Sequence, residues 1–368
     1  MGKRGALAAI VLWFLIASPA LKAADGKPGW QKKWEETVEA ARREGQVTIA
    51  ISGYAGVIEA FKKEFPEIKP VLITAPGAQL TARIMAEYRA GKYLADLYSA
   101  GANSAYNVLH KGKALDPLKP VLILPEVVDG SKWYGGKHRY IDLEDKHIFA
   151  YVGNAGPGQF HYNTQLVSPK EFKSYGDLLQ PKWKGKIVSM DPRLTGIGAT
   201  LQFFYYHSEL GPDFIRKLYG TMNVALSKEE RQMTDWLAQG KFALCIGCQD
   251  APRAKDHGLP VHTFDTTAWK EGGSLTSSFG SLSLLRHAPH PNAAMVFTNW
   301  LFSRGGQIAL QRIGRPQDPP NSRRIDIPKD DVPPERRVVP GRKYLDVTRP
   351  EWQDMAPIFD LVKEVLAR

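Results

Sequence analysis

The sequence predicts an α/β protein of two lobes, with mainly parallel sheets flanked by helices and a hinge of crossing strands. Three observations support this. The chain has 368 residues, more than one hydrophobic core usually covers. Short apolar runs alternate with amphipathic segments, which is typical of strands covered by helices on both faces. Glycine-rich stretches at 153–158 and 272–273 interrupt the alternation, and we expect the chain to cross between lobes there.

The first residues, 1–24, have the order of a secretory signal peptide. Lys3 and Arg4 precede an apolar run over 5–17, and small residues follow it. The run is shorter than the roughly 20 apolar residues that span a bilayer. No cysteine near the cleavage region offers a site for a lipid anchor. We therefore expect cleavage between Ala20 and Asp25 and export of the mature chain.

The net charge of +11 leaves about +8 once the basic residues of the leader are removed. A basic protein can bind nucleic acid, an anionic surface or an acidic ligand. Export makes nucleic acid an unexpected partner. Part of the excess lies in a proline-rich C-terminal stretch, which we expect to be a solvated loop, at Arg323–Arg324, Arg336–Arg337 and Arg342–Lys343.

The first lobe is expected to cover residues 25–155. Its apolar runs are short enough for strands, and its amphipathic segments are long enough for helices. Gly45 and Gly91 follow two of those segments, as glycine does at helix ends. The pattern predicts helices at 30–44, 57–65, 80–90 and 104–110, and strands at 47–51, 71–73, 94–99 and 148–152.

The second lobe is expected at 156–273 and repeats the alternation. Ser227 with Glu230 three residues on predicts a capping box, opening a helix that Gly240 ends. The pattern predicts strands at 159–163, 186–189, 242–246 and 261–264, and helices at 197–210, 212–220 and 227–239. Residues 274–368 then return to the first lobe, with a strand at 282–285, a helix at 292–302, a Pro/Arg-rich wrap at 316–350 and a C-terminal helix at 351–367.

Ligand-binding residues are expected where strands end and helices begin. Ligands of open α/β sheets bind at the carboxyl ends of the strands. Each turn there combines glycine, which lets a ligand approach the backbone, with a hydrogen-bonding side chain. Helix starts offer N–H groups and partial positive charge to anions. In the first lobe these residues are Ser52, Tyr54, Gly77, Gln79, Gly101 and Asn103.

The matching turn of the second lobe is 191–198. Arg193 could bind a carboxylate or phosphate as a fork, and Thr195 could cap the helix that follows Gly196 and Gly198. Small polar residues also make turns that bind nothing. The interpretation as a ligand site therefore depends on the turns of both lobes together, with Cys248 and Gln249 as further members.

Cys245 and Cys248 are the only cysteines, spaced C-x-x-C. In an oxidising compartment they could form a disulfide, remain buried thiols, line the cleft, or serve a metal or redox centre. No second Cys/His pair at zinc-finger spacing accompanies them, and Gln249 excludes a C-x-x-C-H haem site.

Motifs of catalysis are missing from the sequence. We find no G-x-S-x-G, H-E-x-x-H or P-loop pattern. We therefore predict a binding protein without catalytic residues, cofactor or metal site. The alternative of a redox enzyme depends on the two cysteines alone.

Several segments resemble the extracellular solute-binding proteins of ABC importers, in the subgroup that contains the ferric-iron binders. The resemblance covers most of the mature chain and is most specific in Asn292–Phe297 followed by Ser303–Gln307. It also includes 34–48, 77–83, 191–200 and 236–243. It implies a type II periplasmic-binding-protein fold, a periplasmic location, and delivery of a small-molecule ligand to a permease at the inner membrane by a monomer.

One position departs from that family. Ferric members place two adjacent tyrosines where this sequence reads Ile246-Gly247-Cys248-Gln249-Asp250. Tyr205–Tyr206 lie in an apolar helix, where core packing is expected. The sequence therefore favours an organic anion of the carboxylate or phosphonate type. Iron or another metal remains an alternative ligand, and sensing with a membrane receptor remains an alternative function.

Overall fold

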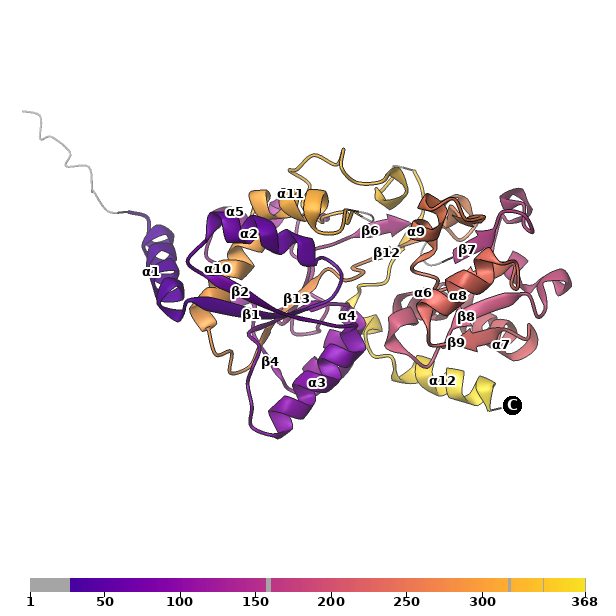
Figure 1. Ribbon diagram of the computed structural model, residues 1–368, viewed down its shortest axis with the longest axis horizontal. Helices are drawn as coiled ribbons and strands as arrows, with labels where there is room; N and C mark the ends of the chain where they lie inside the picture. The colour runs from indigo at the N-terminus through magenta and orange to yellow at the C-terminus, as the bar shows by residue number, and fades with distance from the viewer. Residues whose placement is uncertain (1–26, 157–159, 317–318, 340, 368) are drawn as a thin grey trace, which may run out of the picture.

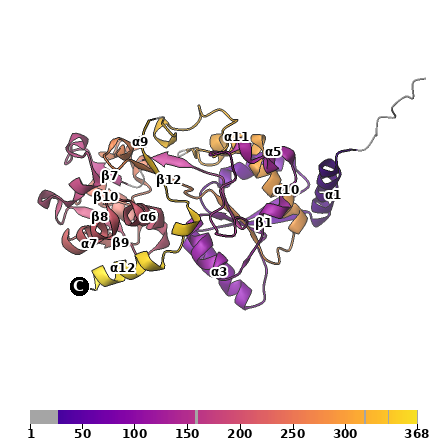
Figure 2. The same cartoon turned by 180° about the vertical axis from the view of Figure 1, so that it is seen from behind.

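The computed structural model describes residues 27–156, 160–316, 319–339 and 341–367. The predicted signal peptide, 1–24, lies outside the described residues. None of the described helices combines the length and the apolar character needed to cross a bilayer. Two lobes lie side by side, each with its own sheet, and Figures 1 and 2 show them from opposite sides. Figure 1 shows β6 (Asn154–Gly156) and β12 (Gly273–Thr276) between them.

The sheet of the first lobe has the strand order β2-β1-β3-β13-β4, with β5 also paired to β13. β1 is parallel to β2 and β3, whereas β13 runs antiparallel to its neighbours. The elements are β1 (Gln46–Ile51), β2 (Lys69–Thr74), β3 (Leu97–Ala100), β4 (Leu115–Asp116), β5 (Ile148–Ala150), β13 (Ser281–Leu285), α1 (Gly29–Glu44), α2 (Ile58–Glu64), α3 (Gly77–Arg89), α4 (Ala102–Ser104), the π-helical turn η2 (Ala105–His110), α5 (Pro125–Val128), α10 (Pro291–Phe302) and α11 (Arg304–Ile313).

The apolar run of β1 is buried on both faces, because helices cover the sheet on either side. Phe61 of α2 packs edge-on against Phe297 and Trp300 of α10. Gly45 ends α1 in the left-handed conformation, with φ 71°. The first-lobe alternation that the sequence predicts is therefore present, with shifts of a few residues at element ends.

The sheet of the second lobe has the order β11-β7-β10-β8-β9. β10, β8 and β9 are parallel, and β7 runs antiparallel between β10 and β11. The elements are β7 (Phe160–Asn163), β8 (Ile187–Met190), β9 (Ala225–Ser227), β10 (Leu244–Ile246), β11 (Val261–Thr263), α6 (Gly198–Tyr206), α7 (Gly211–Thr221), α8 (Glu230–Ala238) and α9 (Ala251–Asp256).

Three short strands form a third sheet between the lobes. β12 (Gly273–Thr276) pairs antiparallel with β6 (Asn154–Gly156) and parallel with β14 (Tyr344–Asp346). β6 and β12 are the two crossings expected from the glycine-rich stretches. β14 adds a crossing in the C-terminal segment that the sequence analysis does not predict.

The C-terminal helix, α12 (Ala356–Leu366), packs on the second lobe and not on the first as expected. Its apolar residues Ile358, Leu361, Val362 and Val365 join the second-lobe core. A Cβ on Gly220 of α7 would lie 3.3 Å from Val365, which shows how closely the two helices approach. Figure 1 shows α12 beside α7. The expected assignment of 351–367 to the first lobe is wrong, because β14 carries the chain across.

The Pro/Arg-rich wrap has little regular structure, as expected, but it is not uniformly solvated. Arg323 and Arg324 are 3% and 0% exposed. The Arg324 guanidinium donates to the Asp326 carboxylate and to the backbone oxygen of Phe302. The Arg323 guanidinium donates to the backbone oxygen of Val152 and to Thr348. A buried guanidinium requires such partners, so these two arginines fasten the wrap to the body of the protein.

Candidate ligand-binding cleft

The candidate site comprises, in the first lobe, the turns that follow β1 and β3 and the start of α3. Ser52 is half-buried and Gln79 is exposed. Tyr54 is only 2% exposed, and its ring packs edge-on against Phe279 with centroids 6.0 Å apart. A Cβ on Gly53 would lie 2.5 Å from Phe279, so the turn needs glycine there. Of the predicted side chains in the β1 turn, Tyr54 therefore serves packing.

Three helices whose starts carry predicted site residues begin without a side-chain cap. The N-cap residues are Pro76 for α3, Gly101 for α4 and Ile197 for α6. Helix starts leave backbone N–H groups unsatisfied within the helix, and these favour a polar or anionic group. Gly77, the first residue of α3, faces Tyr98 and Ser104, which lie 3.0 and 3.6 Å from where its Cβ would be.

The two lobes touch at Asn103 and Gly198. A Cβ on Gly198 would lie 3.0 Å from Cγ of Asn103. Nearby, α3 packs against the short helical turn η8 (Thr195–Ile197) of the second lobe. The side-chain nitrogen of Asn103 is buried and has no hydrogen-bond partner among the described residues. A buried donor left unsatisfied costs about 1–3 kcal/mol.

The Arg193 guanidinium is paired within its own turn. Its guanidinium donates to both carboxylate oxygens of Asp191, at 2.8 and 2.6 Å, within the same turn. This hydrogen-bonded pair lowers the pKa of Asp191 and raises the pKa of Arg193. The fork expected for a ligand is therefore occupied by a neighbouring carboxylate. The backbone of Thr195 lies in η8, and Gly196 is exposed with Met190 close to it.

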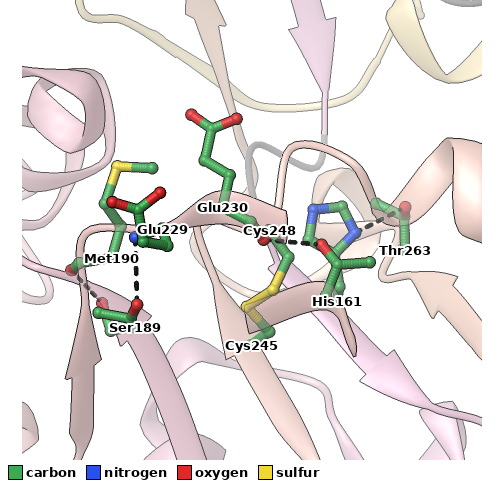
Figure 3. The surroundings of a disulfide bond; sticks show 10 residues. His161, Ser189, Met190, Glu229, Glu230, Cys245, Cys248 and Thr263 are labelled. Carbon is green, nitrogen blue, oxygen red and sulfur yellow. Dashed lines mark hydrogen bonds between the residues drawn. A yellow bond between two sulfur atoms is a disulfide. The ribbon is translucent and has the colours of Figure 1, made fainter. Parts of the chain in front are cut away.

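Cys245 and Cys248 form a disulfide at the carboxyl end of β10, with Cα atoms 6.0 Å apart. The disulfide interpretation of C-x-x-C is thus the one that the structure supports. Both residues are at most 1% exposed. The sequence predicts Cys248 as a ligand-binding residue, but its sulfur is bonded to Cys245 and its side chain is buried. Gln249, the next residue, is half-buried. Figure 3 shows the disulfide with Met190 on one side and His161 on the other.

The sequence analysis does not single out two charged residues, one from each lobe, that interact with each other. Glu230, at the start of α8, is half-buried, and its pKa is raised by this loss of solvent and by the nearby Asp250, while Arg315 opposes the shift. Arg315 follows α11 in the first lobe, and its guanidinium lies 5.6 Å from the Phe279 ring. Opposite charges from the two lobes thus face each other. The sequence around Arg315 does not indicate this position. The neighbouring residue, Gly314, accepts from the N–H of Gly56, so the position of Arg315 depends on a contact between distant segments.

The expected capping box of α8 is not formed. The Ser227 hydroxyl accepts from the N–H of Glu229 and donates to Gln232. The helix begins only at Glu230, so the Glu230 carboxylate is not used as a cap. In Figure 3 this carboxylate points away from the disulfide.

Comparison with known proteins gives a family and a fold. A family model of bacterial extracellular solute-binding proteins matches residues 45–308, more than half of the chain. A search of curated proteins found no match.

Solved structures resemble the chain over nearly their whole length. A Trichodesmium protein (IdiA, FutA) in complex with iron and citrate is 18% identical with a TM-score of 0.64, covering 87% of this chain and 99% of its own. AfuA from Actinobacillus pleuropneumoniae with fructose-6-phosphate is 20% identical with a TM-score of 0.62, covering 88% and 98%. A protein described as a two-component system protein that mediates signal transduction is 18% identical with a TM-score of 0.61, covering 87% and 99%. At these identities the likeness shows the fold, which is two-lobed and of the type II periplasmic binding class.

Proposed function

Since the chain belongs to the family of bacterial extracellular solute-binding proteins, we propose that it is the periplasmic receptor of an ABC importer and that it binds a small anionic solute between its lobes. The observation that carries the proposal is the buried amide nitrogen of Asn103 at the contact between the lobes, for which the described part of the chain offers no hydrogen-bond partner. A solute acceptor that satisfies this donor only when Gly198 is close would favour the closed form. A ligand shifts a conformational equilibrium only through such differential contacts.

The charge of the ligand follows from the groups around the cleft. The uncapped starts of α3 and α4 lie in the first lobe, where Arg315 adds a positive charge. On the other wall, Glu230 and Asp250 supply carboxylates. We therefore place the anionic group of a carboxylate or phosphonate ligand against the first lobe, near Gly77, Gly101 and Asn103. Ser52, Gln79, Thr195, Gly196, Gly198 and Gln249 complete the proposed set of binding residues.

The other parts of the proposal follow from the family. Export through the signal peptide at 1–24 would bring the chain to the periplasm, where a C-x-x-C disulfide can persist. A monomer would present both lobes to a permease of the inner membrane. The proposed role needs no chemistry on the solute, only closure and release.

Ferric iron is the second candidate ligand, because the Trichodesmium structure contains iron and citrate. Its site would need phenolates, and the expected place holds Cys248 and Gln249. Tyr206 stacks on Trp352 with ring centroids 4.8 Å apart, and Tyr205 packs against the second-lobe core. These contacts support a packing role for both rings. Sensing is the second candidate function, because one similar structure is described as a signal-transduction protein.

The test is native mass spectrometry of the chain purified without refolding, followed by calorimetric titration of the co-purified solute and of a panel of carboxylates, phosphonates and Fe³⁺. We expect an organic anion and a radius of gyration that falls on binding. Asn103→Ala should weaken binding about tenfold, which corresponds to about 1.4 kcal/mol. Gln165→Ala, at an exposed position of the second lobe, is the control.

Two results would decide against the proposal. Tight binding of Fe³⁺, with no response to any organic anion, would show that the ligand is iron and not an organic anion. No binding and no change of radius across the panel would remove the receptor role. A permease reconstituted in liposomes separates import from sensing. Uptake of the ligand that depends on this protein would indicate import, and its absence would favour sensing.

A further inference from the structure

Four metal-ligating side chains gather on the first lobe, away from the disulfide and the β1 turn. They are His110 of η2 and Asp142, Glu144 and His147 of the segment before β5. One ligand atom from each lies within 4.8 Å of the others. His110 Nε2 is 3.1 Å from a Glu144 carboxylate oxygen, and the rings of His110 and His147 have centroids 5.2 Å apart.

Asp142 fixes the geometry of this cluster. Its carboxylate is fully buried and accepts from the backbone N–H groups of Lys146, His147 and Ile148. A carboxylate oxygen also lies 3.1 Å from Nδ1 of His147. Because an ionised carboxylate only accepts hydrogen bonds, Nδ1 of a neutral His147 donates to it, and Nε2 then keeps its lone pair. A carboxylate that orients a histidine in this way is the usual outer partner of a metal-bound imidazole.

Partial exposure leaves the other ligands accessible. The side chains of His110 and His147 are 17% and 14% exposed, and that of Glu144 is 48% exposed. A metal ion could therefore enter without unfolding the loop. The His110 ring is stacked on Tyr106, which restricts its rotation. The two imidazoles and one carboxylate thus come from a helix and a loop that are each held by packing or hydrogen bonds.

We propose that His110, Glu144 and His147 form a binding site for a divalent transition metal of the Zn²⁺ type, with Asp142 as the orienting residue. Zn²⁺ combines imidazole and carboxylate ligands at about 2.0–2.2 Å, usually with four ligands in a tetrahedron. Hard ions such as Mg²⁺ and Ca²⁺ take mostly oxygen ligands, and in the proposed set only Glu144 offers oxygen. Three protein ligands leave one position for water.

The site is distinct from the proposed solute cleft, so it would hold a structural or regulatory ion and not the transported cargo. Binding would fasten the 142–147 loop to η2. The next residue of that helical segment, Lys111, pairs with Asp354 at 2.6 Å, and Asn107 donates to the backbone oxygen of Gln353. The ion would therefore stabilise the surface of the first lobe on which the crossing C-terminal segment rests.

The experiment uses the mature chain without a histidine tag, freed of metal by chelator and titrated with ZnCl₂ by calorimetry. We expect one Zn²⁺ per chain. His110→Ala and Glu144→Gln should each weaken binding at least tenfold, and Asp142→Asn about 10- to 100-fold, the range for outer-partner losses. His257→Ala, at an exposed histidine of the second lobe, should bind as the parent does.

A second measurement keeps the test valid if a variant is unstable. Co²⁺ in place of Zn²⁺ should give the visible absorption of a low-coordinate site in the parent and in His257→Ala, and not in His110→Ala. Circular dichroism without metal checks that each variant is folded. Failure of the parent to bind Zn²⁺, or binding that His110→Ala leaves unchanged, would overturn the proposal whatever solute the cleft binds.

Discussion

The side chain of Asn103 in the first lobe lies directly against Gly198 in the second, with only 3.0 Å between Cγ and the place of a Cβ on residue 198. The lobes can approach this closely only because residue 198 has no side chain. Gly198 begins α6, so the backbone that touches Asn103 belongs to a helix start without a side-chain cap.

A larger residue at 198 should therefore hold the lobes apart. We predict that Gly198→Val weakens binding of the co-purified solute about tenfold, since overpacking costs about 1–3 kcal/mol. The radius of gyration of the loaded protein, measured by small-angle X-ray scattering, should exceed that of the parent. Gly29→Val, where a Cβ would meet nothing within 4 Å, is the control. Unchanged affinity and radius in Gly198→Val would show that closure does not use this contact.

Arg193 should act on Asp191 and not on the solute. We predict that Arg193→Ala leaves solute affinity unchanged and raises the pKa of Asp191 toward its ordinary value, because the side-chain hydrogen bond that lowers it is lost. NMR titration of the Asp191 carboxyl group measures this shift. A large loss of affinity in Arg193→Ala would restore the anion-binding role that the sequence suggests.

The pair of Asp191 and Arg193 should make the free energy of unfolding depend on pH in one direction. The folded pKa of Asp191 lies below its unfolded value. Its contribution to stability is therefore present above the unfolded pKa and is lost as the pH falls through the folded pKa. The difference in unfolding free energy between the parent and Arg193→Ala should be larger at pH 7 than at pH 2. Arg253→Ala, at an exposed position of α9, should show no such trend.

His161 should make the second lobe sensitive to mild acid. Burial lowers its pKa to about 3, and its Nδ1 lies 3.0 Å from the Thr263 hydroxyl. In the unfolded chain His161 is protonated below about pH 6.5, whereas in the folded chain it stays neutral down to about pH 3. The free energy of unfolding therefore falls as the pH drops from 6.5 toward 3. Between pH 6.5 and 5 the loss should be about 2 kcal/mol, at 1.36 kcal/mol per pH unit.

Urea unfolding at pH 7 and pH 5 measures this loss, with His161→Gln as the variant. The variant should lose that part of the pH dependence, whereas His262→Gln, at the exposed neighbouring position on β11, should keep it. Equal pH dependence in the parent and His161→Gln would mean that His161 is not buried in its neutral form.

The disulfide should stabilise the second lobe and should not catalyse thiol–disulfide exchange. Replacing both cysteines by serine frees a loop of about four residues, and the chain-entropy relation gives a loss of about 2 kcal/mol. Urea unfolding of oxidised parent and Cys245→Ser/Cys248→Ser measures it. A thiol–disulfide exchange assay on the parent should show no turnover, because both sulfur-bearing residues are at most 1% exposed. Turnover that the double substitution abolishes would favour the redox alternative.

The sequence by itself determined the elements whose signals are short-range. The apolar run of β1 forms a buried strand, and Gly45 and Gly240 adopt positive φ at helix ends, because only nearby residues are needed to specify them. The spacing of Cys245 and Cys248 brings the two residues close enough to bond. The alternation of strands and helices likewise predicted two α/β lobes before any contact was known.

Only the tertiary structure decided which residues meet across the chain. The apolar stripe of α12 fits either lobe as a pattern, and the crossing at β14 placed it on the second. The contacts of Asn103 with Gly198 and of His110 with Glu144 join segments far apart in sequence. Such contacts depend on how whole sheets and helices pack together. The conformational preferences of neighbouring residues do not specify that packing.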